Sequence, residues 1–187
     1  MREVITEAII LDKEDLGEQD SRIFLFTKDL GKLVAKATSA RKITSKLAAH
    51  LEPLSYIEAR LVSRGDAGDG RGFQVADALE IDSKPGLDAE QLSEVIRTLE
   101  VVRASVPENV PDEELWNFLQ IVRQGKTELG TGPALKKLGF DFTFAWCELC
   151  KSAKPEYFFP RSNWFVCQTC RLNSKEEKRE FIKIKRP

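Results

Sequence analysis

Apolar and polar residues alternate over roughly the first eighty residues of the chain, with the period of two that is typical of β-strands. Glycines separate five such segments, rich in β-branched and aromatic residues: residues 4–11, 22–27, 32–38, 54–63 and 72–79. A run of good helix formers at residues 45–51 follows the third segment and must end before Pro53. Five strands with a helix after the third predict an OB barrel, while SH3-like barrels and other small β folds remain alternatives.

Beyond residue 84 the apolar residues recur every three or four positions, which predicts helices. Asp88 is the expected N-cap of the first helix, because Gln91 three residues later completes a capping box. This helix should end before Pro107. Its predicted apolar stripe consists of Leu92, Val95, Ile96, Leu99 and Val102.

Three shorter helical segments are also predicted. Pro111 and Asp112 are expected to open a second helix, and a third short element should follow at residues 134–138. Near the end of the chain, Ser174 and Glu177 fit a capping box for a short terminal helix. The pattern as a whole predicts an α+β chain.

The four cysteines of the chain form the pattern C-x-x-C, sixteen residues, C-x-x-C: Cys147, Cys150, Cys167 and Cys170. Each C-x-x-C turn can present two sulfurs to one ion, and the intervening stretch can form a hairpin that brings the pairs together. The spacing predicts one structural Zn²⁺, because four thiolates leave no open coordination position. A rubredoxin-like iron site would use the same sulfur cage, and redox pairs or disulfides are further alternatives.

Charge is distributed unevenly although the formal net charge is only -1. Residues 142–187 carry ten basic and five acidic side chains, whereas residues 82–141 carry seven basic and eleven acidic ones. The sequence contains no membrane span, and its first residues lack the apolar core of a signal peptide. We therefore expect a cytoplasmic protein with no membrane partner, in which paired cysteines bind metal instead of forming disulfides.

A basic run lies between residues 28 and 50, where six basic residues accompany a single acid, Asp29. Such a patch suits phosphates, although a basic loop is often only a solvated surface. The candidate DNA-binding residues of the region are Lys32, Lys36, Arg41, Lys42 and Lys46. Four rings could stack on unpaired bases, although alternation along the strands predicts that about three of them are core. These rings are Phe24, Phe26, Tyr56 and Phe73.

A second basic surface is predicted around the cysteine pairs, on weaker grounds, since a basic rim around a zinc ribbon is often only solvated. It comprises Lys151, Lys154, Arg161, Arg171 and Lys175. No catalytic constellation is present: the single His50 has only Glu52 close by in sequence, and no nucleophile-elbow or P-loop pattern occurs. The sequence therefore favours a binding protein over an enzyme.

Several segments resemble, in order, the amino-terminal signature of RecO, the bacterial recombination mediator family. They are T-E-A-I-I-L at 6–11, L-G-E-Q-D at 16–20, L-F-T at 25–27 and G-K-L-V-A-K at 31–36. The resemblance continues with A-R-K at 40–42, S-K-L at 45–47, L-E-P at 51–53, and residues 135–139 before the first cysteine pair. Ser39 stands where that family usually has glycine, and the chain ends seventeen residues after Cys170, where the family usually continues into further helices. A short version of the family's helical region is therefore expected.

The resemblance implies an OB-fold DNA-binding domain at residues 1–81 and a helical domain at residues 82–187, with the zinc module at about residues 142–173. It also implies a role in DNA repair, recombination and the DNA damage (SOS) response. Such a protein binds single- and double-stranded DNA, anneals complementary strands and works with RecR and single-stranded-DNA-binding protein to place RecA on DNA. It would act in the bacterial cytoplasm, at the nucleoid. An alternative is a non-catalytic adaptor whose barrel and zinc ribbon bind other proteins.

Overall fold

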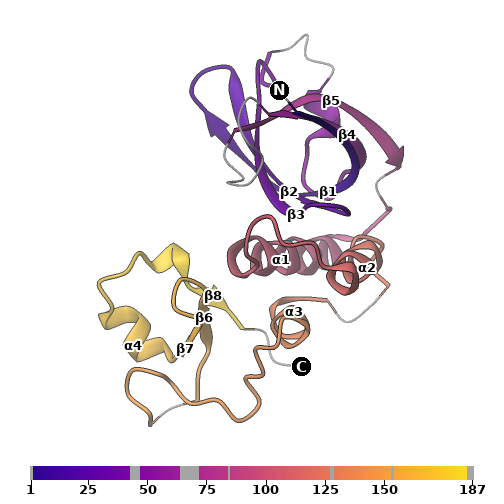
Figure 1. Cartoon of the computed structure of the whole chain (residues 1–187). Coiled ribbons are helices and arrows are strands. Elements are labelled where there is room, and N and C mark those ends of the chain that lie inside the picture. The colour runs from indigo at the N-terminus through magenta and orange to yellow at the C-terminus, as the bar shows by residue number, and fades with distance from the viewer. Residues whose placement is uncertain are drawn as a thin grey trace. The chain divides into compact units, whose positions relative to one another are not determined.

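A computed structural model describes residues 2–42, 47–63, 72–83, 85–126, 129–152 and 154–184 (Figure 1). The chain is α+β and forms two compact units that interleave in sequence. Residues 1–87 and 107–126 make up the first unit, and residues 88–106 and 127–187 make up the second. The boundary expected between residues 81 and 82 stays a prediction.

Five strands of the first unit close into a barrel in the order β1-β2-β3-β5-β4, with β4 returning to β1 (Figure 1). The strands are β1 Arg2–Leu16, β2 Asp20–Thr27, β3 Gly31–Ala37, β4 Tyr56–Ser63 and β5 Phe73–Asp82. Only the β3–β5 pairing is parallel among these strands. A five-stranded closed barrel with this order is OB-like, so the predicted fold class is confirmed.

Alternating side chains of every strand fill the barrel, as the period of two requires. On the β2–β3 hairpin, Ile23, Leu25, Leu33 and Ala35 point inward and are at most 2% exposed. The helix expected at residues 45–51 is reduced, in its described part, to one 3₁₀ turn, η1 Ala48–His50. That turn ends at Leu51, which is fully buried in the barrel core.

Helix α2, Glu113–Val122, belongs to the barrel unit and begins where the sequence predicted. The Asp112 carboxylate accepts a hydrogen bond of 2.8 Å from the Leu115 N–H, as an N-cap does. At the other end of the helix, the fully buried Arg123 donates to the Asp82 carboxylate at 3.1 Å and lies over the Tyr56 ring. This arginine therefore ties α2 to β4 and to the end of β5.

Helix α1, Ala89–Ser105, opens the second unit, and the predicted capping box between Asp88 and Gln91 is confirmed. The predicted apolar stripe is only partly correct, because Leu92 and Ile96 are 42% and 39% exposed. The buried residues of the helix are Glu94, Val95, Thr98, Leu99, Val101 and Val102. Packing thus selected a face that includes Thr98, whose hydroxyl accepts a 2.9 Å hydrogen bond from the Gly130 N–H before α3, Thr131–Lys137.

The carboxyl-terminal segment of the second unit forms a small antiparallel sheet in the order β7-β6-β8 (Figure 1). Its strands are β6 Tyr157–Phe159, β7 Trp164–Val166 and β8 Ile182–Lys183; α4, Gln168–Asn173, follows β7. Among the residues described, no helix is both long and apolar enough to cross a membrane.

The terminal helix predicted from Ser174 and Glu177 is wrong. Ser174 ends α4, its hydroxyl accepts from the Glu176 N–H at 3.1 Å, and only one 3₁₀ turn follows, η2 Lys178–Glu180. The chain then extends as β8, because Phe181 and Ile182 enter two different apolar clusters. Side chains that leave the backbone in opposite directions require a strand and not a helix.

Candidate metal centre and nucleic-acid interface

The four cysteine sulfurs come together as the spacing predicted, all within 4.8 Å of one another. The Sγ atoms of Cys150 and Cys167 are 4.0 Å apart. A tetrahedral cage with metal–sulfur bonds of about 2.3 Å has sulfurs about 3.8 Å apart, so the geometry suits a metal ion held by four thiolates.

Two backbone turns and a hairpin position these sulfurs. In the first turn the Lys151 N–H donates to the Cys147 carbonyl at 2.8 Å, and in the second the Arg171 N–H donates to the Cys167 carbonyl at 3.0 Å. A 2.8 Å hydrogen bond from the Glu148 N–H to the carbonyl of Phe165 joins the first turn to β7. The β6–β7 hairpin therefore sets the distance between the two pairs.

Cys147 and Cys167 also belong to an apolar cluster with Tyr157, Phe159, Val166 and Phe181, and the partly buried Cys170 packs against it. Hydrogen bonds from Ser152 lower the pKa of Cys150 to about 6, which favours its thiolate at neutral pH. Partial burial and the neighbouring thiols raise the pKa of Cys170 to about 12. A cation among the four sulfurs would oppose that rise, because it stabilises the thiolate.

Arg171 and Lys178 bind each other's segments next to the second cysteine turn. The Arg171 guanidinium lies 4.5 Å from the centre of the Tyr157 ring and donates to the Lys178 carbonyl at 3.0 Å. In return, the Lys178 ammonium donates to the carbonyls of Leu172 and Ser174, both at 2.9 Å, where it satisfies the end of α4. Arg171, expected on a second basic surface, is thus engaged in packing the module.

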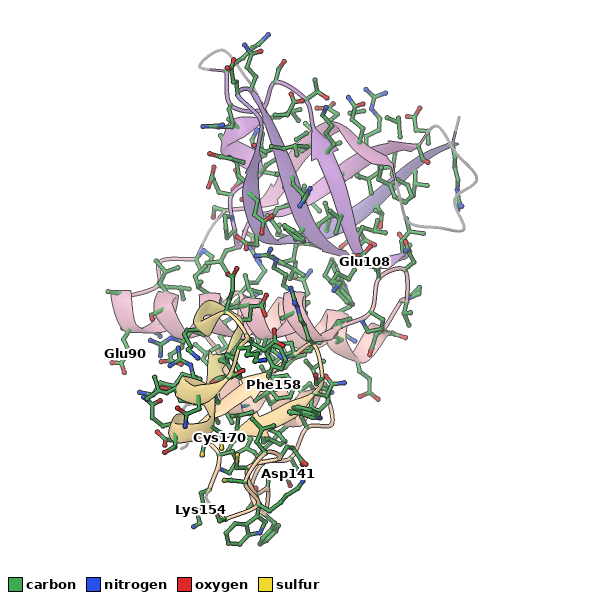
Figure 2. All side chains as sticks on the ribbon, turned by 90° about the vertical axis from the view of Figure 1, so that its left-hand side faces the viewer. Glu90, Glu108, Asp141, Lys154, Phe158 and Cys170 are labelled. Atoms are coloured by element: carbon green, nitrogen blue, oxygen red, sulfur yellow. The ribbon has the colours of Figure 1, made fainter. Side chains whose placement is uncertain are left out.

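The other four residues expected on that surface are exposed. Lys151 pairs with Glu148 and Arg161 pairs with Glu180 at 2.8 Å. Lys154 projects from the module beyond Cys170 (Figure 2). The basic surface itself stays a prediction.

On the barrel, the predicted DNA-binding residues have different surroundings. Lys36 pairs with Asp20 at 2.7 Å, and Arg41 pairs with Asp15 at 3.1 Å. Lys42 is exposed, whereas Lys32 is buried at 8% exposure. Lys46 lies outside the described residues.

Ser39 and Asp20 hold the basic segment after β3 against the β1–β2 turn. The Asp20 carboxylate accepts from the Ser39 N–H at 2.8 Å, and the Arg41 N–H donates to the Gln19 carbonyl at 3.0 Å. The hydrogen bond from Lys36, followed by that from Ser39, lowers the pKa of Asp20. Ser39 has a φ of 56°, so it adopts the left-handed conformation that glycine accommodates more easily.

The outer face of the β2–β3 hairpin gathers residues that the sequence separates. Arg22 lies opposite Lys36, and Phe24 lies opposite Val34. Arg22 is exposed and Phe24 is half-buried, whereas Phe26 and Phe73 are buried and Tyr56 packs edge-on against Trp116. Of the four rings, Phe73 belongs to the barrel core cluster, whereas Phe26 is buried on the opposite face of β2. The expectation that about three of them are barrel core is therefore wrong, because alternation turns Phe24 and Phe26 away from the inward-pointing Leu25. Arg22 was missed, although the alternation along β2 could have placed it beside Phe24.

Comparisons with known proteins point to one family. A family model described as "Recombination protein O N terminal" matches residues 1–72. The chain is 29% identical over 185 residues to a protein of Myxococcus xanthus named DNA repair protein RecO, covering 91% of the chain and 73% of that relative. It is 30% identical over 180 residues to a Dehalococcoides mccartyi protein of the same name, covering 89% of the chain and 69% of the relative. A Thermodesulfovibrio yellowstonii protein of that name is 25% identical over 174 residues.

Proposed function

The chain belongs to the RecO family of DNA repair proteins, and on this premise we propose that it binds single- and double-stranded DNA, anneals complementary strands and helps RecR load RecA. The observation that carries the proposal is the outer face of the β2–β3 hairpin. There Arg22 and Lys36 lie side by side next to the half-buried Phe24. OB barrels bind oligonucleotides on this hairpin and at the neighbouring loops.

Ion pairing within the barrel is compatible with phosphate binding. The pairs Lys36–Asp20 and Arg41–Asp15 join partly exposed groups, and such pairs contribute about 0–1 kcal/mol each. A phosphate can therefore replace a carboxylate at small cost, while it gains the entropy of counterion release. Lys42, at the end of the same segment, adds a further exposed cation.

Annealing needs no chemical step in this scheme. Cations that neutralise two strands at once lower the repulsion between them, so complementary bases can meet without ATP. We accordingly propose a non-catalytic cytoplasmic protein. Zinc is proposed as the ion of the four cysteines, with a structural role only.

A second candidate function is a protein-binding adaptor without DNA affinity. It is favoured by one observation: the two cations Lys36 and Arg41 each lie beside a carboxylate, which lowers the positive potential of the barrel. RecR, RecA and single-stranded-DNA-binding protein remain proposed partners in either case.

A salt series separates the two functions. Anisotropy of a labelled single-stranded oligonucleotide should show a log-linear loss of affinity with salt, at about 0.7 per phosphate contacted. Arg41→Glu with Lys42→Glu should reduce that slope by about 1.4 and slow annealing of the complementary strand. Arg60→Glu is the matched control, because Arg60 is an exposed, ion-paired arginine on β4 of the same barrel. Absence of binding even at low salt would leave only the adaptor.

A further inference from the structure

The module that holds the cysteines exposes large aromatic side chains. Phe144 is 89% exposed, Trp146 55% and Trp164 43%, and Leu149 and Leu172 are exposed at 49% and 56%. Scattered single apolar residues are ordinary on a surface, but several from one short segment indicate a place where something binds.

Two observations bring the tryptophans to the same part of the module. The hydrogen bond from the Glu148 N–H to the Phe165 carbonyl joins segments in which Trp146 and Trp164 are at most two residues away. Phe165 is buried in one apolar cluster, while its neighbour Val166 belongs to the cluster of the cysteines. Alternation along β7 therefore places Trp164 on the same face as Val166 and the sulfurs.

The charge around these rings complements a polyanion. Residues 142–175 carry five basic side chains and two acidic ones. Lys151, Lys154 and Arg161 are exposed, and Lys154 projects from the module (Figure 2). Lys151 and Arg161 are paired with Glu148 and Glu180, and a phosphate can replace a carboxylate in such partly exposed pairs at small cost. Aromatic rings interleaved with cations are the combination with which proteins bind single strands, since rings stack on bases and cations contact phosphates.

We propose that Trp146 and Trp164, which we call the aromatic edge, form a second binding surface for single-stranded nucleic acid. The proposal rests on the function given above and extends it, because the barrel and the aromatic edge could then each hold one of the two strands to be annealed. Its ligand is an unpaired strand, because bases within a duplex offer no free faces to the rings.

Tryptophan fluorescence can measure binding at this surface, because two of its residues are tryptophans. The chain has three tryptophans, and the third, Trp116, is 5% exposed in α2 of the barrel unit. Titration of the metal-loaded protein with an oligothymidylate of about 16 nucleotides should quench the emission of Trp146 and Trp164 and leave that of Trp116. The Trp146→Phe, Trp164→Phe variant should lose the quench but keep most of its affinity, because phenylalanine still stacks.

The Trp146→Ala, Trp164→Ala variant should bind the oligothymidylate about ten-fold more weakly per ring removed, measured by anisotropy at a salt concentration that suppresses the phosphate contacts. Metal content and the unfolding midpoint are measured on both variants. Since both side chains are substantially exposed, both variants should keep the metal and the fold.

The outcomes distinguish this proposal from the function on which it rests. Quenching that is lost in the phenylalanine variant, with affinity lost only in the alanine variant, supports the aromatic edge. Oligonucleotide binding without quenching, equally strong in the alanine variant and weakened by Arg41→Glu with Lys42→Glu, overturns the aromatic edge and leaves the barrel function intact. No binding by any of these proteins overturns both.

Discussion

The barrel and the cysteine module are stabilised in different ways. The barrel buries a cluster of fifteen residues, most of them aliphatic, drawn from all five strands and the segment between β3 and β4. The apolar residues of the module enter two smaller clusters. One of them is shared with Val101 of α1 and with Ala134 and Leu135 of α3, and the other includes Cys147 and Cys167. A core of the first kind is self-sufficient, whereas one that contains the ligands of an ion depends on that ion.

The two regions also differ in the side chains that accompany their cations. On the barrel, Lys36 and Arg41 are neutralised by acids brought close by the β1–β2 turn. In the module, Lys151 and Arg161 are likewise paired with Glu148 and Glu180, but exposed aromatic rings occur in the same segments. Under the two proposals above, a phosphate would replace a carboxylate on the barrel, and bases would stack on the aromatic rings of the module.

Metal removal should have the largest effect on stability. It should unfold the cysteine module and leave the barrel folded. Metal binding to four-cysteine sites contributes about 10–16 kcal/mol in small zinc domains, so chelation or Cys147→Ser should unfold β6–β8. Hydrogen exchange would show amides of Tyr157–Phe159 and Trp164–Val166 losing protection, while β1–β5 keep theirs. Equal loss of protection in the barrel would show that the two regions are not independent.

Arg123→Ala should destabilise the barrel unit. The substitution removes a fully buried guanidinium that binds Asp82 and covers Tyr56, and it should lower the free energy of unfolding by about 3 kcal/mol in urea denaturation. Arg60→Ala, which removes an exposed ion pair with Glu3, should cost at most about 1 kcal/mol. If both variants lost a similar free energy of unfolding, the burial of Arg123 would add nothing to stability beyond an exposed ion pair.

Tyr56 should give the barrel a dependence on alkaline pH. Burial, together with the hydrogen bond to Glu7, raises the pKa of Tyr56 to about 12. Because the folded pKa lies above the ordinary value of 10, the stabilisation is complete below pH 10 and is lost as the pH rises towards 12. Tyr56→Phe should cost about 1–2 kcal/mol at neutral pH and flatten that decline, measured by denaturation at several pH values. If stability declined equally in the variant as the pH rises, other titrating groups would be responsible for the decline.

Ser39→Gly should have the smallest effect, a gain of about 0.5 kcal/mol. The serine holds a φ of 56°, and glycine reaches this conformation without the steric cost of a Cβ, although it loses more backbone entropy on folding. Ser39→Ala keeps the Cβ and should give no gain in the same thermal unfolding assay. Equal midpoints for the two variants would show that the backbone there is unstrained.

Local patterns in the sequence determined the five barrel strands, the starts of two helices and the grouping of the four cysteines. Alternation identified the five strands, Asp88 and Asp112 marked the starts of α1 and α2, and the cysteine spacing indicated the four sulfurs that now lie within 4.8 Å. Each of these signals depends on residues close in sequence, because strand period, helix capping and a C-x-x-C turn are local physics.

Only the tertiary structure decided which side chains are exposed on the surface and which are buried or paired. Strand register brings Asp20 to Lys36 and Arg22 beside it, and burial removes Lys32 from the surface. Packing likewise turned Leu92 outward and extended Ile182–Lys183 as β8. These outcomes depend on partners far away in sequence, whose positions are fixed only when the barrel closes and the hairpin folds, and no local pattern carries that information.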